Sequence, residues 1–241
     1  MALIEEHVKS GNWLFKYRSY LPISLFILYF IGLIQDNLPE HLFQQNGWLI
    51  ACFSVAIIGQ IIRIITVGKV PMNTSGRNTK KQKAGSVNTF GIYSTVRHPL
   101  YLGNYFMWLG MFLLIPIIWV QIIFSLIYWV YYERIMIAEE EFLREKFGEE
   151  YLKWANETPA FIPKFNRFKK NPMQYSLKKI VGREYTSFSA MVLLFIILIF
   201  VNNGFVFGDW QVSQNLNIIF WATLTFYICL RTLKKKTNLF K

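Results

Sequence analysis

The sequence predicts an all-α, multi-pass transmembrane protein with about six spanning helices. Of its 241 residues, 54% are hydrophobic and 18% are aromatic. Several apolar runs approach or exceed the roughly 20 residues that a spanning helix needs. The 26 lysines and arginines give a formal net charge of +12, yet none lies in residues 35–46 or 202–215. This is the positive-inside pattern, which places those two segments outside and both termini on the cytoplasmic side.

The same charge distribution argues against a nucleic-acid partner, because the basic residues lie in loops between apolar segments. The sequence has no glycine-rich dinucleotide motif, no Walker motif and no zinc-like spacing of cysteine and histidine. Cys52 and Cys229 lie in apolar segments, where a thiol usually acts as a small hydrophobic group. We therefore expect no soluble nucleotide-binding domain, no metal site, and a first helix that is retained in the membrane.

Two spans are expected before the first long loop. The apolar run Leu21–Gln35 is short and would need residues 13–20 to cross as a tilted helix. The next run, Gly47–Val67, is long enough by itself. Its polar residues Gln60 and Arg63 are three apart and share one helix face. Arg63 is either an arginine that reaches the inner membrane surface or a substrate-binding residue.

A polar, basic loop over residues 68–98 leads to the longest apolar run of the chain. As one helix that run, Leu100–Tyr132, would be about 50 Å long, whereas the hydrocarbon core is about 30 Å thick. Two full crossings need about 40 residues, so we expect a hairpin of two short helices folded at Pro116. Residues 133–154 follow with an amphipathic helical pattern that is interrupted near Gly148.

The last part of the chain consists of a basic surface stretch, residues 166–183, and a final pair of spans. These spans are Tyr185–Val201 and Leu216–Leu233. We divide the chain into an N-terminal span pair (1–67), a central segment with the loop, hairpin and amphipathic helix (68–165), and a basic C-terminal segment with two spans (166–241).

Candidate functional residues gather where the basic loop meets the hairpin. Pro99 suits the first position of a helix and keeps His98 in extended backbone. The helix would aim unpaired N–H groups and the positive end of its dipole at the loop, where an anionic group could bind. By itself, Arg97-His98-Pro99 is also consistent with an ordinary helix entry.

Three consecutive glutamates, Glu139 to Glu141, follow the hairpin and could simply form a solvated acidic face. The hairpin, however, brings the start of its first helix beside the exit of its second. The loop residue His98 and the glutamates should therefore face each other across a small gap. A zwitterionic ligand would match such an arrangement.

Three ordered motifs together cover about a third of the chain. They are Gly91-x-Tyr93-x-x-x-Arg97-His98-Pro99-x-Tyr101-x-Gly103, then Glu139-Glu140-x-x-Leu143-x-x-x-Phe147-Gly148-x-x-Tyr151, then Pro159-x-x-x-Pro163. In these motifs the chain resembles the isoprenylcysteine carboxyl methyltransferase and phospholipid methyltransferase superfamily.

This resemblance implies a methyltransferase that binds S-adenosylmethionine within the membrane domain and takes a lipid-linked acceptor from the bilayer. It implies that a C-terminal cytosolic amphipathic helix closes the cofactor site. The cofactor-binding residues that it implies, besides loop residues 85–88, are Tyr93, His98, Pro99, Leu100, Tyr101, Glu139 and Glu140.

The acceptor is the open part of the prediction. Arg97 and Arg134 are the candidate catalytic residues, and Arg63 and Arg134 are the candidates for substrate binding. These cations favour an oxygen that is already ionised over an amine that must first lose a proton. In the prenylcysteine enzymes, an acceptor-binding arginine stands four residues before the cofactor glutamate, where this chain has Ile135.

A lipid phosphate, for example that of lipid A, or a carboxylate is therefore the first expectation. The alternatives are methylation of an isoprenylcysteine carboxylate, methylation of the phosphatidylethanolamine amine, and a non-catalytic lipid-binding or transporter-type protein.

Overall fold

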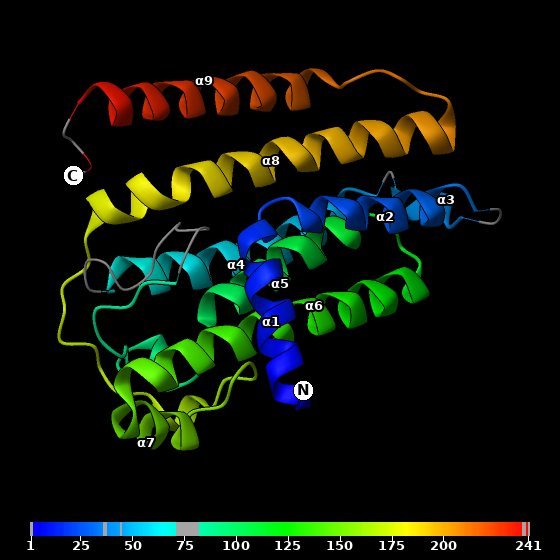
Figure 1. Cartoon of the computed structure of the whole chain (residues 1–241). Coiled ribbons are helices and arrows are strands. Elements are labelled where there is room, and N and C mark those ends of the chain that lie inside the picture. The colour runs from blue at the N-terminus through cyan, green and yellow to red at the C-terminus, as the bar shows by residue number, and fades with distance from the viewer. Residues whose placement is uncertain (1, 36–37, 44, 71–81, 238–239, 241) are drawn as a thin grey trace.

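The computed structural model describes residues 2–35, 38–43, 45–70, 82–237 and 240. Their regular elements are helices, and the strand-like pairing found among them is one bridge between Gly91 and Lys169. The predicted all-α class is confirmed. The α-helices are α1 (Leu3–Tyr17), α2 (Leu25–Leu33), α3 (Glu40–Phe43), α4 (Asn46–Gly68), α5 (Pro99–Phe112), α6 (Ile118–Phe147), α7 (Glu149–Glu157), α8 (Leu177–Phe207) and α9 (Gln214–Lys236), and the short 3-10 helices are η1 (Leu21–Ser24), η2 (Ile92–Ser94) and η3 (Phe165–Arg167) (Figure 1).

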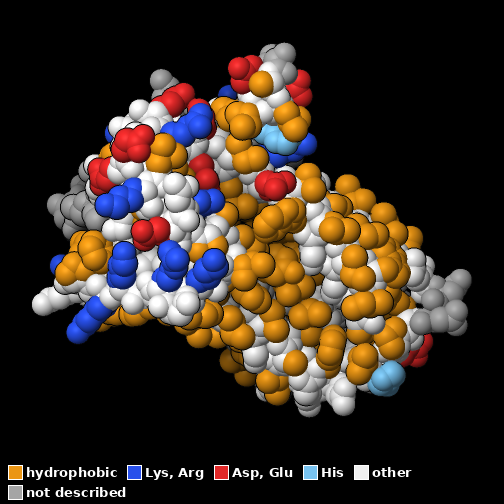
Figure 2. All heavy atoms as spheres, turned by 90° about the horizontal axis from the view of Figure 1, so that it is seen from below, with side chains coloured by type: hydrophobic (Ala, Val, Ile, Leu, Met, Phe, Trp, Pro, Cys, Tyr) orange, Lys and Arg blue, Asp and Glu red, His pale blue; other side chains and the backbone are white. Residues whose placement is uncertain are grey.

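Four of the described helices, α4, α6, α8 and α9, are long and apolar enough to cross a membrane. A fifth span is possible if α1 and the η1–α2 segment count together as one bent span. Helix α5 has 14 residues and is only about 21 Å long. Figure 2 shows hydrophobic side chains over one half of the visible surface and charged side chains gathered over the other. The protein is an integral membrane protein, but the count of six spans is not confirmed.

The first apolar segment differs from the prediction. Residues 13–17 do not lengthen it into a tilted span, because they belong to α1, which is bent by 82° from the next helical segment. Pro22 stands in the first turn of η1, where a proline can begin a helix but cannot continue the preceding one. Helix α1 instead lies across α6, and a Cβ at Gly11 would be 2.0 Å from the carbonyl oxygen of Arg134. Only a glycine permits this approach.

Helices α4 and α5 pack closely along a seam of small residues. A Cβ at Gly59 would lie 2.4 Å from the carbonyl oxygen of Gly103. One at Gly110 would lie 2.6 Å from the carbonyl oxygen of Cys52. Small residues are typical of membrane helix interfaces, where close backbone approach provides van der Waals contact. This seam places polar side chains of α4 and α5 within hydrogen-bonding distance of each other.

The predicted hairpin is confirmed, with its turn between the end of α5 and the start of α6 around Pro116. Irregular backbone at membrane depth needs internal hydrogen-bond partners. The Gln121 amide donates to the carbonyls of Phe112 and Ile115, and the Asn202 amide donates to that of Leu114 at 3.2 Å. The turn is therefore held from both α6 and α8.

Helix α6 continues without interruption into the acidic segment and ends at Gly148, whose φ of +52° favours glycine. This confirms that a helix continues from the hairpin through residues 133–147 and is interrupted at Gly148, while the amphipathic character expected for this extension stays a prediction. Helix α8 begins at Leu177, eight residues before the predicted span, so part of the basic stretch is helical. Helix α9 runs beside α8 and has no buried residue, which leaves most of its surface to lipid (Figure 1).

Candidate functional site

The loop before α5 is held in place by the segment that follows α7. The backbone N–H of Arg97 donates to the Pro159 carbonyl at 2.8 Å, and that of His98 donates to the Ala160 carbonyl at 3.2 Å. His98 has non-helical backbone angles, and α5 begins at Pro99, as the sequence predicts. The segment after α7 therefore holds the backbone of this motif through main-chain hydrogen bonds.

The acidic part of α6 meets this motif. The Glu140 Oε1 atom lies 2.8 Å from His98 Nε2 and 3.0 Å from Arg97 Nε. The Glu139 carboxylate lies 3.7 Å from His98 Nδ1 and accepts a 2.8 Å hydrogen bond from the Tyr101 hydroxyl. The prediction that the helix start and the glutamates face each other across the hairpin is thus confirmed.

These contacts change what the cluster can bind. The sequence suggests that Arg97 or His98 donates to the carboxylate of a ligand, but both side chains are already paired with Glu140. A ligand anion would have to compete with that carboxylate. Glu139, by contrast, has a quarter of its side chain exposed, and its charge faces a site that suits a cation.

A cavity of about 770 Å³ opens beside this cluster. Of the predicted site residues, those that line it are Arg63, Tyr93, Arg97, His98, Pro99, Leu100, Tyr101 and Glu139. Loop residues Ser86, Val87 and Asn88 line it too, within the predicted 85–88 segment. Glu140 is not a lining residue and lies behind the wall, bonded to Arg97 and His98. Residues 71–81, which are 11 of the 31 residues in the predicted basic loop, are outside the described part of the chain.

Helix α7 covers the loop side of the cavity. Its Trp154 indole donates to the Tyr93 carbonyl at 3.2 Å, and Arg97 donates to the Ala155 carbonyl at 2.7 Å. Burial and, next, the Glu139 charge raise the pKa of Tyr93, while burial and then the Glu140 charge raise the pKa of Tyr151. Both phenols are therefore neutral at ordinary pH and can donate hydrogen bonds.

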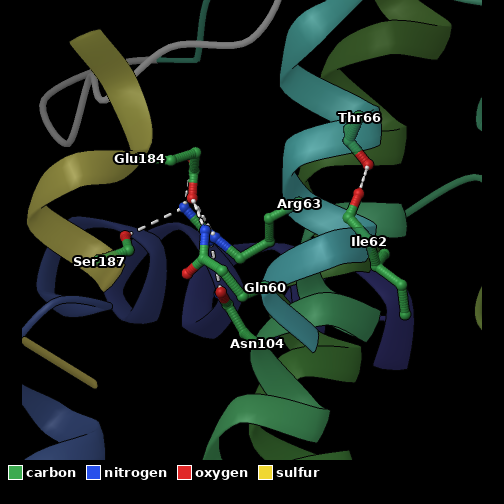
Figure 3. Close-up of polar contacts among 7 residues, drawn as sticks. All are labelled: Gln60, Ile62, Arg63, Thr66, Asn104, Glu184 and Ser187. Atoms are coloured by element: carbon green, nitrogen blue, oxygen red, sulfur yellow. Dashed lines mark hydrogen bonds and ion pairs between the residues drawn. The ribbon is translucent and has the colours of Figure 1, made fainter. Parts of the chain in front are cut away.

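A second polar cluster lies on the opposite wall, between α4, α5 and α8 (Figure 3). The guanidinium of Arg63 binds Glu184 through Nε at 2.8 Å and Nη2 at 2.9 Å. It also donates to Asn104 at 2.5 Å and to Ser187 at 3.2 Å. Gln60, one turn earlier on α4, donates to Glu184 at 3.1 Å. Gln60 and Arg63 share one face, as predicted, and both bind Glu184 between the helices.

Arg134 is not brought into the cavity. Its Nη1 atom donates to the Ser10 hydroxyl of α1 at 3.2 Å, and it is not among the lining residues. Ile135, at the position of the expected acceptor arginine, is completely buried in the core. One residue turns a helix by about 100°, so the neighbouring arginine faces a different element. The catalytic and substrate-binding roles predicted for Arg134 therefore have no support in this geometry.

Sequence reasoning missed the contribution of α8. Arg183, Glu184 and Ser187 line the cavity although they lie beyond the resembling motifs. One sequence signal was available, because Glu184 is the only acidic residue between Glu157 and Asp209. An isolated acid beside an apolar span is costly to bury and so suggests a function. Among the described residues, no group of three or more His, Cys, Asp or Glu side chains could hold a metal ion.

Part of the chain is similar to known proteins. The family model for phospholipid methyltransferases matches residues 44–150, which include α4, α5 and α6. The protein-S-isoprenylcysteine O-methyltransferase of Schizosaccharomyces pombe is 35% identical over 86 residues, which are 35% of this chain and 36% of that protein. The matched part of the chain is therefore similar to phospholipid and isoprenylcysteine methyltransferases, and each of these two matches covers less than half of the chain.

Other relatives match to a similar extent. The protein-S-isoprenylcysteine O-methyltransferase of Saccharomyces cerevisiae is 31% identical over 121 residues, 48% of each chain. The nickel-cobalt-cadmium resistance protein NccN of Alcaligenes xylosoxydans xylosoxydans is 30% identical over 132 residues, 54% of this chain and 58% of that protein. In each of these relatives, the match spans less than two thirds of the protein. No solved structure matches the chain.

Proposed function

We propose that the protein is a membrane-embedded methyltransferase that uses S-adenosylmethionine to methylate a carboxylate carried by a lipid-linked acceptor, of the isoprenylcysteine type. The observation that carries the proposal is the cluster of His98, Tyr101, Glu139 and Glu140 beside the cavity, inside the segment that the superfamily shares. We assign the active site and both termini to the cytoplasmic side, because the positive-inside rule predicts that side for the basic segments.

The residues of the cluster suit the cofactor. A cavity of about 770 Å³ is within the range of about 300–1,000 Å³ that is typical of small-molecule sites. When bound, S-adenosylmethionine supplies an electrophilic methyl group on a positively charged sulfur. Glu139 can receive the ammonium group or the ribose hydroxyls, while the aromatic faces of Tyr93 and Tyr101 suit a cation. Trp154 and the apolar side chains of Phe142 and Leu143 provide a surface for an aromatic ring.

The other end of the cavity suits a lipid chain. Met107, Trp108 and Met111 of α5 line it, opposite Met191 and Leu194 of α8.

The charged residues of the cavity are mostly positive. The lining cations, Arg18, Arg63, Lys83, Arg97 and Arg183, outnumber the lining carboxylates, Glu139 and Glu184. This excess of positive charge favours an anionic acceptor. A carboxylate is ionised at neutral pH, so the protein has to orient it and needs no general base.

The relatives guide the choice among anionic acceptors. Those with enzyme names are isoprenylcysteine O-methyltransferases, which favours a carboxylate. They give no support to the lipid phosphate, or lipid A, that the sequence analysis considered. The phosphatidylethanolamine amine remains the alternative acceptor, because the matching family model describes phospholipid methyltransferases.

Calorimetry with S-adenosylmethionine and S-adenosylhomocysteine, on the purified protein in nanodiscs, tests the cofactor site. We expect His98→Ala and Glu139→Ala each to weaken binding about tenfold or more, because each removes a charged or charge-paired group from the site. Glu145→Ala is the matched control, since Glu145 is an exposed glutamate on the same helix. Wild-type protein with no affinity for either compound would support the non-catalytic alternative.

Turnover is then measured with two acceptors, an S-farnesyl cysteine derivative with a free carboxylate and phosphatidylethanolamine. Methylation of the first alone supports the proposal. Methylation of the second alone would instead assign the protein to amine methylation.

A further inference from the structure

Helix α8 supplies a buried carboxylate to the acceptor half of the cavity. Glu184 is 4% exposed and forms a two-pronged ion pair with Arg63, Nε to Oε2 and Nη2 to Oε1 (Figure 3). Such a pair fixes the plane of the guanidinium as well as its position. Asn104 of α5 accepts a 2.5 Å hydrogen bond from Nη1, the third nitrogen of the guanidinium, and so holds that nitrogen in place. The arginine is therefore held in one orientation from two neighbouring helices.

Burying this ion pair costs more free energy than a contact that only joins two helices requires. Ionised groups inside a membrane protein lose most of their hydration, and apolar side chains can pack helices at lower cost. The structure has a less costly link between α8 and the core elsewhere, because the Tyr29 hydroxyl of α2 donates to Asn202 at 2.9 Å. We therefore expect the charged pair to have a function in the cavity that it lines, besides joining the helices.

The arginine of this pair stands where the acceptor needs one. The expected acceptor arginine is replaced by buried Ile135, and Arg134 is bonded to α1. Arg63 lines the cavity together with both Glu139 and the apolar residue Met107. A guanidinium has five N–H donors, and its hydrogen bonds among the described residues use four of them. The remaining N–H is on Nη1, so an acceptor carboxylate would bind there beside Glu184 and would not have to displace it.

We propose that Arg63 anchors the acceptor carboxylate through Nη1 and that Glu184 is the residue that positions it. Helix α8 is then part of the active site, although it lies outside the family match. This inference rests on the proposed function. It names the residues that would bind the acceptor in this chain, which has Ile135 where the prenylcysteine enzymes have an arginine.

The ion pair also explains how the product can leave. Methylation converts a carboxylate into a neutral ester, so the anchor loses its anionic partner at the end of each turnover. An arginine without another partner would then be a bare buried cation, which is strongly disfavoured. Because Glu184 neutralises Arg63 throughout, neither the empty site nor the product complex contains an uncompensated charge at this point.

Steady-state kinetics with the S-farnesyl cysteine derivative test the proposal. We expect Glu184→Gln to raise the KM for the acceptor about tenfold or more, while the affinity for S-adenosylmethionine stays within about twofold of wild type. Glu184→Asp, which keeps the charge, should fold as the wild type does and raise the KM less. Tyr29→Phe is the control, because it removes a bond between α2 and α8 outside the cavity and should leave the KM unchanged.

The exchanged double variant Arg63→Glu with Glu184→Arg separates positioning from simple bridging. It retains an ion pair between α4 and α8, so thermal stability should return toward wild type, whereas the acceptor KM should stay raised because the guanidinium is on the other wall. Recovery of both would show a structural bridge only and overturn the proposal. Unchanged KM in Glu184→Gln would overturn it too, with the proposed function intact. If the wild-type protein had no affinity for S-adenosylmethionine, both this inference and the proposed function would be overturned.

Discussion

Replacing Gly59 with alanine tests the closest contact between α4 and α5. A Cβ at this position would lie 2.4 Å from the Gly103 carbonyl oxygen and 2.6 Å from the Met107 nitrogen. Both are backbone atoms, so no side chain can rotate to make room. Ordinary van der Waals contact begins at 3.4 Å, and the two helices would therefore have to separate by about 1 Å.

The expected loss of stability follows from two opposing contributions. Overpacking in a close interface costs about 1–3 kcal/mol, and the backbone contacts at Gly59 place this substitution at the upper end. Alanine offsets about 1 kcal/mol of that cost, because it is a better helix former than glycine. We therefore expect Gly59→Ala to lower the free energy of unfolding by about 2 kcal/mol.

Gly59→Ala should also lower the rate of methyl transfer strongly. Arg63 lies one turn after Gly59 and donates to Asn104 across the same seam at 2.5 Å. A shift of about 1 Å breaks that hydrogen bond, and misplacement on this scale can reduce a reaction rate about 100-fold. Thermal unfolding in detergent and methyl transfer to the S-farnesyl cysteine derivative measure the two effects.

Gly47→Ala is the matched control for this experiment. Gly47 is in the first turn of the same helix, and a Cβ there meets no atom within 4 Å. It should stabilise the helix by about 0.5–1 kcal/mol and leave turnover unchanged. If Gly59→Ala matched this control in both measurements, the close approach of α4 and α5, and the site geometry that depends on it, would be refuted.

Two further predictions concern the remaining arginines. Arg134→Ala should leave the acceptor KM within about twofold of wild type, because its side chain bonds to Ser10 away from the cavity; a tenfold rise in KM would return it to the acceptor site. Arg97→Lys should speed hydrogen exchange of residues 149–157, measured by mass spectrometry, because an ammonium group cannot replace the guanidinium that contacts both Glu140 and the Ala155 carbonyl. Unchanged exchange would show that α7 does not depend on this contact.

Local features of the sequence were sufficient to predict the hairpin and the first cluster. Pro99 and Pro116 constrain their own backbones wherever they stand, so the start of α5 and the turn after it follow from the chain itself. Once the hairpin is inferred, the contact between His98 and Glu139 follows, because both flank it. The same reasoning did not predict the sharp bend before Pro22, since an apolar run shows its length but not its direction.

The second polar cluster, around Arg63, depends on contacts between residues far apart in the chain. Arg63 and Glu184 are 121 residues apart, and no local pattern pairs an arginine on one span with a glutamate on another. Likewise, the sequence does not give the directions in which the adjacent residues Arg134 and Ile135 face. The packing of α1 on α6 decides that Arg134 contacts α1 and that Ile135 lies in the core. The sequence by itself determined the membrane class, the hairpin and the cluster of His98 with Glu139 through local backbone and hydrophobic constraints. The tertiary structure alone decided which arginines line the cavity, because side-chain partners across a helix bundle are set by interhelical packing.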